Sequence, residues 1–143
     1  MILMKIRGRR IHLFTLLVAA AALLFGACNN TPALLYHNFL ADLDILTRFN
    51  LTLNRLGDGE YDSYTKDEIV VLRQDLSTWD IDDHDTAEIN DMFIAAADSM
   101  HDCMGLLRDG DAISAALMLE QANAYFTEAK ALIIRHNMGA EYV

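Results

Sequence analysis

Residues that break helices are scarce in this chain, which contains one proline, Pro32, and seven glycines among its 143 residues. No stretch shows the sustained alternation of apolar and polar side chains that is typical of a half-buried β-strand. The scarcity of turn residues and the missing alternation both argue against a sheet. We therefore expect an all-α fold.

Positive charge is also scarce. Residues 28–143 hold seven Lys and Arg and all twenty-one Asp and Glu, which gives a formal charge of −14. The acids are concentrated between Asp58 and Asp111. Nucleic-acid binding requires basic patches, so the composition argues against a nucleic-acid partner. A field of this sign also repels anionic lipid headgroups.

The chain lacks the usual signatures of catalysis and of disulfide scaffolds. It has two cysteines, Cys28 and Cys103, which are too few for a disulfide framework. It contains no glycine-rich phosphate loop, no haem-attachment motif and no local signature of a Ser or Cys nucleophile. We therefore expect no enzymatic activity and no cofactor, and a domain that is stabilised by packing.

The first 28 residues have the pattern of a secretory signal peptide. A basic start, MILMKIRGRR, precedes an uncharged apolar run over residues 11–25, and the small residues Gly26 and Ala27 follow. A transmembrane helix needs about 20 apolar residues, so this run is short for a membrane span. Export is the expected fate of the chain.

The sequence Phe25-Gly26-Ala27-Cys28 resembles the lipobox of bacterial lipoproteins, with Phe25 where Leu is usual. The resemblance implies cleavage before Cys28 and attachment of a diacylglyceryl group to its sulfur. It divides the chain into a signal peptide (1–27), a lipidated cysteine with a short tether (28–31) and a helical domain (32–143). The alternative is an ordinary signal peptide followed by a coincidental cysteine that pairs with Cys103.

Four helices are expected in the domain. The first begins at Thr31-Pro32 and ends at Gly57, and the second is short and begins at Thr65. The third begins at Asp85 and ends at Gly110, and the fourth runs from Asp111 to about Asn137. The first helix has a heptad seam with one polar member, Leu35, Phe39, Asp42, Leu46, Phe49, Leu53 and Leu56. The predicted architecture is an antiparallel up-and-down four-helix bundle.

Two groups of residues are candidate binding sites. The loop DIDDHD places Asp80, Asp82, Asp83 and Asp85 together. We interpret them as a docking surface for a basic or helical partner. The alternatives are a weak divalent-cation site and a solvated loop whose last acids cap a helix. The second group offers sulfur and imidazole ligands that suit copper, although its sulfur-bearing members also lie on the expected apolar stripe and fit the core. This group comprises Met100, His101, Cys103 and Met104.

The favoured function is a membrane-anchored, non-catalytic helical binding or scaffold module of the bacterial cell envelope; the alternative is a metal-binding bundle. The expected location is the extracytoplasmic face of the cell membrane or the outer membrane, with an envelope protein as partner. Only three residues separate Cys28 from Pro32, a reach of about 10 Å. We therefore expect Tyr36 to lie near the lipid and the acidic loop to face away from it.

Overall fold

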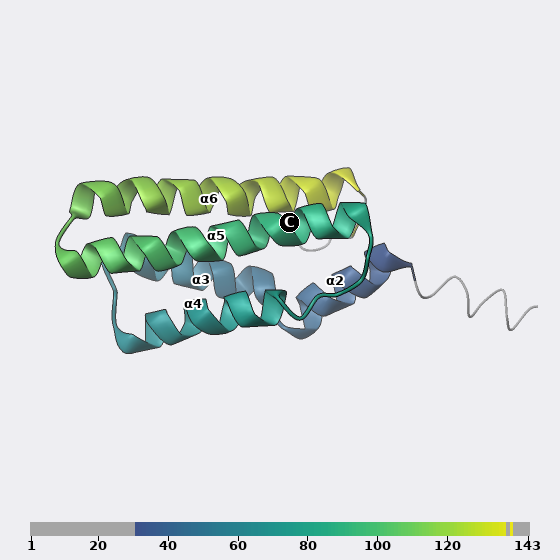
Figure 1. Cartoon of the computed structure of the whole chain (residues 1–143), viewed down its shortest axis with the longest axis horizontal. Helices are drawn as coiled ribbons and strands as arrows, with labels where there is room; N and C mark the ends of the chain where they lie inside the picture. The colour runs from purple at the N-terminus through teal and green to yellow at the C-terminus, as the bar shows by residue number, and fades with distance from the viewer. Residues whose placement is uncertain (1–30, 137, 139–143) are drawn as a thin grey trace, which may run out of the picture.

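The computed structural model describes residues 31–136 and 138, and the described chain is helical (Figure 1). Five helices follow one another in this described part of the chain. They are α2 (Pro32–Asp42), α3 (Ile45–Gly57), α4 (Ser63–Leu76), α5 (His84–Asp109) and α6 (Ala112–Arg135). The all-α class is confirmed, whereas the expected number of four helices is wrong by one.

The additional helix arises because the expected first helix is broken between Asp42 and Ile45. Asp44 has a φ of 50°, a left-handed conformation that no continuous α-helix contains. Arg48 Nη1 donates a hydrogen bond of 3.1 Å to the carbonyl oxygen of Leu43 and so satisfies a backbone group that the break exposes. The break divides the expected first helix into α2 and α3.

The break also corrects the expected heptad seam. In α2, Tyr36 and Leu40 are buried, one position later than the expected Leu35 and Phe39. Asp42 is exposed, so the polar residue in the seam never enters the core. In α3 the buried positions include Phe49, Leu53 and Leu56, as the seam predicted.

Side-chain caps define where the later helices begin. Asp111 caps α6, and Gly110 ends α5 in the left-handed conformation, both as predicted. The predicted starts of α4 and α5 are wrong by two residues or fewer, because Asp62 caps α4 and Asp83 caps α5. Thr65 is instead a buried residue within α4.

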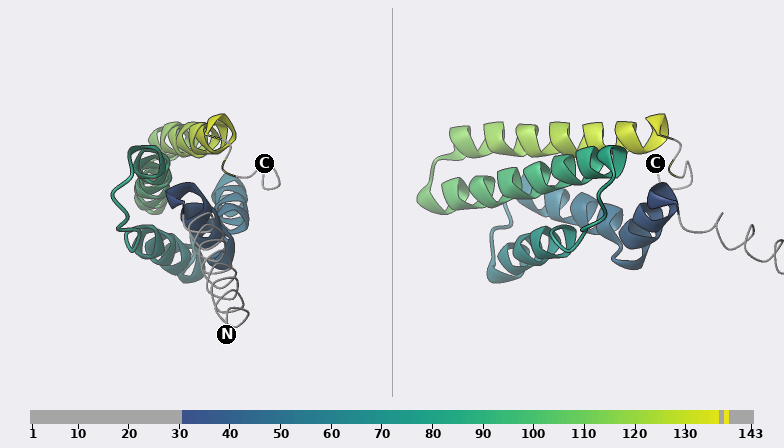
Figure 2. Two further views of the ribbon diagram at one scale, coloured as in Figure 1. Left: turned by 90° about the vertical axis from the view of Figure 1, so that its right-hand side faces the viewer. Right: turned by 45° about the vertical axis from the view of Figure 1, so that its right-hand side comes forward.

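The longest helices, α5 and α6, lie side by side in opposite directions and are joined by a short turn (Figures 1 and 2). Small buried residues allow them to approach closely. These residues are Ala96, Ala97, Ala115, Ala122 and Ala129. α4 packs on α5, and α3 packs mainly on α4 and α6. α2 lies at the end where α4 ends and α5 begins (Figure 1).

Two aromatic clusters mark the core. Phe49, Phe93 and Phe126 come from three helices, and their ring centroids are 5.2–6.0 Å apart. At the α2 end, the rings of Tyr36 and Trp79 meet edge to face at 4.8 Å. No helix in the described part of the chain is both long and apolar enough to cross a membrane.

Candidate functional site

The predicted lipidation site, Cys28, lies outside the described residues, as do the signal peptide and most of the tether. The described chain begins at Thr31, whose side-chain oxygen accepts a hydrogen bond of 3.3 Å from the backbone N–H of Leu34. This cap and Pro32 at the first helical position begin α2 as expected. The segment that carries Cys28 therefore joins the fold at α2.

The four acids of the predicted docking loop differ in their surroundings. Asp80 and Asp82 are exposed. Asp83 caps α5 by accepting a hydrogen bond of 3.0 Å from the backbone N–H of Thr86. Asp85 lies with its Oδ2 at 3.2 Å from Nδ1 of His136, at the end of α6. Two of the four acids thus stabilise the fold itself, which composition alone did not reveal.

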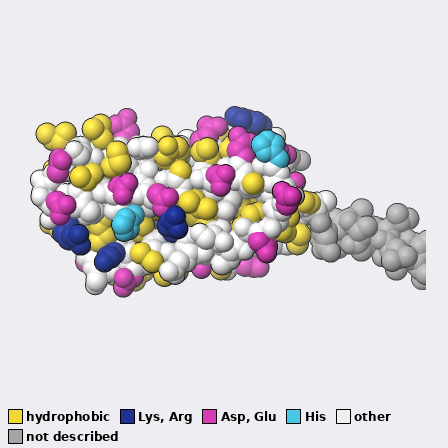
Figure 3. Space-filling view, in the orientation of Figure 1, with side chains coloured by type: hydrophobic (Ala, Val, Ile, Leu, Met, Phe, Trp, Pro, Cys, Tyr) yellow, Lys and Arg dark blue, Asp and Glu magenta, His cyan; other side chains and the backbone are white. Residues whose placement is uncertain are grey.

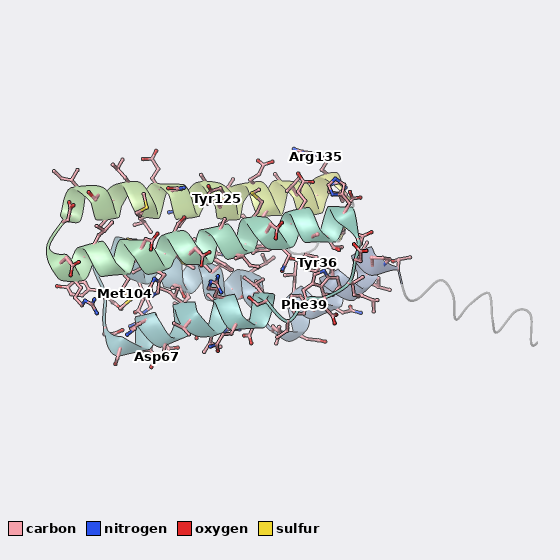
Figure 4. The ribbon with its side chains drawn as sticks, viewed as in Figure 1. Tyr36, Phe39, Asp67, Met104, Tyr125 and Arg135 are labelled. Atoms are coloured by element: carbon pink, nitrogen blue, oxygen red, sulfur yellow. The ribbon has the colours of Figure 1, made fainter. Side chains whose placement is uncertain are left out.

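The loop also lies at an unexpected end of the molecule. Trp79, at its start, packs on Tyr36 and on Phe39 of α2, with ring centroids 4.8 and 5.2 Å apart. Figure 4 shows Tyr36 and Phe39 at the α2 end, beside the chain that joins α4 to α5. The acidic loop is therefore close to α2, where we expected it to be remote. We expected Tyr36 to lie near the lipid, but its side chain is 0% exposed and its ring is packed inside the protein.

The predicted copper-type ligands are divided between the core and the surface. Met100, Cys103 and Met104 are buried, whereas the side chain of His101 is 58% exposed and faces Asp102. Burial raises the pKa of the Cys103 thiol, which favours the protonated form that binds metal poorly. Among residues 31–136 and 138, no three His, Cys, Asp or Glu side chains are grouped to hold a metal ion.

An apolar surface on α6 was not predicted as a site. Ile113 is 80% exposed and Leu117 is 58% exposed, and they lie one turn apart on the same face of the helix. Apolar side chains gather over the first half of α6 in the space-filling view (Figure 3). Beside them is a hollow of about 170 Å³, with Leu56, Cys103, Leu107 and Leu119 among its lining residues. We call Ile113, Leu117 and this hollow the α6 surface.

No family model, curated protein or solved structure matches this chain. The function is therefore argued from the residues of the chain itself.

The perturbed titratable groups of the described chain all have structural causes. Hydrogen bonds from Thr65 lower the pKa of Asp62, and hydrogen bonds from Ser114 lower the pKa of Asp111, because both carboxylates cap helices. Burial raises the pKa of the Tyr36 hydroxyl, which donates to Oδ1 of Asn90 at 3.1 Å. The pKa shifts of Asp62 and Asp111 thus come from helix capping, and the pKa shift of Tyr36 comes from burial in the core.

Arg48 is the centre of a polar network between α3 and α4. It bonds to Glu68 and, at 2.8 Å, to Oδ2 of Asp75. Burial lowers the pKa of Arg48, but the hydrogen bonds to these two carboxylates outweigh it and raise the pKa overall. The network ties α4 to the helix that follows the break.

Proposed function

We propose that this protein is a lipid-anchored, non-catalytic helical binding module of the bacterial cell envelope. The observation that carries the binding role is the α6 surface, where Ile113 and Leu117 remain largely exposed next to an apolar hollow. A contiguous apolar patch of this kind, surrounded by polar residues, is typical of a protein-interaction site. We also propose that α2 and α3 together fill the place of one helix in an up-and-down bundle.

The anchoring proposal rests on the sequence that precedes the described chain. Its basic start, its apolar run and the Phe25-Gly26-Ala27-Cys28 sequence support lipidation of Cys28. Two acyl chains on one cysteine supply enough buried methylene groups for stable attachment without a membrane-spanning helix. Because the tether to Pro32 is short, α2 is the element nearest the membrane.

The proposed partner is a protein with an apolar, helical contact face. Ile113 and Leu117 lie four positions apart, so they form a ridge that fits between the side chains of a second helix. α6 packs mainly on α5 and lies at one edge of the molecule, which leaves its outer face free for such a helix (Figure 2). The exposed acids Asp80 and Asp82 form a second proposed contact area, for basic groups of the partner.

Metabolic labelling with a fatty acid tests the anchor. We expect label on the wild type and none on Cys28→Ser, because the sulfur is the proposed attachment atom. Cys103→Ser is the matched control, and it should be labelled like the wild type. Equal labelling of Cys28→Ser and the wild type would exclude lipidation at Cys28.

Photocrosslinking in cells tests the α6 surface. A photoreactive residue at Leu117 should join the protein to one specific partner. The control is the same residue at Leu51, an exposed leucine of α3 that is 51% exposed. Crosslinks of equal yield and pattern from both positions would show that the α6 surface has no specific partner.

A further inference from the structure

Three of the seven Lys and Arg side chains in the described chain have no carboxylate partner there, and two of these three have no aromatic partner either. Arg48, Arg55, Arg73 and Arg135 each pair with carboxylates, and Lys130 lies over the ring of Phe126. Lys66 and Arg108 are the remaining two. In a domain where acids outnumber Lys and Arg three to one, unpaired cations are unexpected on composition alone.

The two unpaired cations line one cavity. Lys66 of α4 and Arg108 of α5 line it together with His101, Met104 and Gly105, and its volume is about 130 Å³. On the face shown in Figure 3, dark-blue and cyan side chains gather at the ends of α4 and α5 that are remote from α2. Two positive groups placed together repel each other, so the arrangement favours an anion between them. We call this cavity the basic groove.

Gly105 gives the basic groove an open floor. It is an interior residue of α5, where glycine weakens a helix relative to alanine. Packing does not require a glycine here, because a Cβ added at Gly105 would meet no heavy atom within 4 Å. Its φ is not positive either, since the only described glycines with positive φ are Gly59 and Gly110. The absence of a side chain at Gly105 therefore keeps the basic groove open.

We propose that the basic groove binds a compact phosphate-type oxyanion, with Arg108, Lys66 and His101 as its ligands. The guanidinium of Arg108 presents paired N–H donors that match two oxygens of such a group, and Lys66 adds a compact positive charge. His101 lies two turns before Arg108 on α5 and offers a ring N–H. The three side chains thus supply charge and donors on several sides of one anion.

Neighbouring acids restrict the ligand to a small one. Asp102 and Asp109 line a second hollow that shares His101 and Gly105 with the basic groove. Their charges repel an extended polyanion such as nucleic acid but leave room for a single phosphate group in the groove. If the chain is anchored as proposed above, the groove faces away from the membrane, so the ligand is soluble and not a lipid headgroup.

The test is calorimetric titration of the full-length chain in detergent with inorganic phosphate, at low ionic strength. We expect saturable binding that weakens about tenfold in Lys66→Gln and in Arg108→Gln, as for loss of one charge-assisted hydrogen bond. Arg73→Gln and Arg135→Gln are matched controls, because both arginines are exposed and paired. Absent phosphate binding, or equal weakening in the controls, overturns the proposal. So does binding that occurs only to vesicles of anionic lipid.

Gly105→Ala separates binding from stability. The alanine should raise the melting temperature, because it favours the helix and meets no neighbour. It should weaken phosphate binding, because its methyl group occupies the floor of the basic groove. Gly57→Ala, at the end of α3, is the control and should leave the affinity unchanged. Undiminished phosphate binding in Gly105→Ala overturns the proposed position of the anion.

Discussion

Cys103 lies on α5 with 1% of its surface exposed, one turn from Met100. The sequence placed Cys103 both on an apolar stripe and in a sulfur-rich cluster. A core residue has an unreactive thiol, whereas a metal ligand has a reactive one. Burial raises the pKa of its thiol, so the reactive thiolate is scarce and shielded. Its surroundings are those of a core residue.

A thiol-reactive dye tests this in a chain that carries Cys28→Ser, so that Cys103 is the only thiol. We expect native protein to react slower than denatured protein by on the order of a hundredfold or more, because reaction requires local opening. An exposed cysteine introduced by Ser63→Cys in a Cys103→Ser background is the control and should react at similar rates in both states. Fast labelling of native Cys103 would contradict its burial.

The residues of the proposed binding sites differ in how far they could be predicted from the sequence. Lys66 and Arg108 are far apart in the chain and meet only because α4 packs beside α5. No local pattern links them. Ile113 and Leu117, in contrast, are one turn apart on a single helix, so their shared face was visible in the sequence. The acids of the loop at 80–85 were recognised, and helix capping by the last of them was one of the expected roles, but the sequence did not single out Asp83 as the cap.

At the level of helices, residues that act locally were predictable and the break was not. The Thr31-Pro32 start and the Gly110-Asp111 turn follow from short-range chemistry, and the structure has both. The break at Asp44 depends on tertiary contacts, because Arg48 satisfies the carbonyl of Leu43 while it pairs with α4. Asp42 in the expected seam was the only local sign of it.

Asp44 itself is a test of the break. A left-handed φ costs an ordinary residue about 1–2 kcal/mol, and aspartate less. We expect Asp44→Gly to raise the free energy of unfolding by a few tenths to about 1 kcal/mol, and Asp44→Val to lower it by about 1–2 kcal/mol. Denaturant titration followed by Trp79 fluorescence measures both. A lower stability for Asp44→Gly than for Asp44→Val would contradict the left-handed conformation.

The helix caps make stability depend on pH. The pKa values of Asp62 and Asp111 are lowered from 3.8 in the folded state, so folding favours their charged forms. This contribution is complete above the unfolded pKa and is lost as the pH falls through the lower folded pKa. We expect the wild type to lose more stability than the Asp62→Asn/Asp111→Asn variant when acidified below pH 3.8. Parallel losses, measured by urea unfolding, would contradict the role of the charges.

At the scale of the whole molecule, the two ends have different surroundings. α5 has 26 residues and spans about 39 Å, so it separates the α2 end from the turn at Gly110. The acidic loop lies at the α2 end, and the basic groove and the α6 surface lie toward the other. The net charge argued against a nucleic-acid partner but gave no indication of the difference between the two ends, because a count of charges does not say where they lie in the fold.

The difference between the two ends predicts an orientation on membranes. In lipidated protein on vesicles, a spin label at Asp82 should lie near the bilayer and one at Asp111 about 39 Å farther away. A lipid-soluble relaxation agent measures the difference. A label at Asp82 in Cys28→Ser protein is the control and should show no contact with lipid. Equal proximity of Asp82 and Asp111 would exclude anchoring through the α2 end.

The break between α2 and α3 has a mechanical consequence. A pull from the N-terminal side acts on α2 first, and the contacts of Tyr36 with Trp79 and Asn90 resist it. Once they yield, the eleven residues of α2 can extend from about 1.5 to about 3.5 Å each, a lengthening of about 20 Å. We expect the break to stop the unwinding from passing directly into α3, because the two helices share no continuous hydrogen-bond ladder. An optical trap should record this short step before any larger one, and a single unfolding step would contradict it. We therefore expect α2 to extend under load before the rest of the domain unfolds.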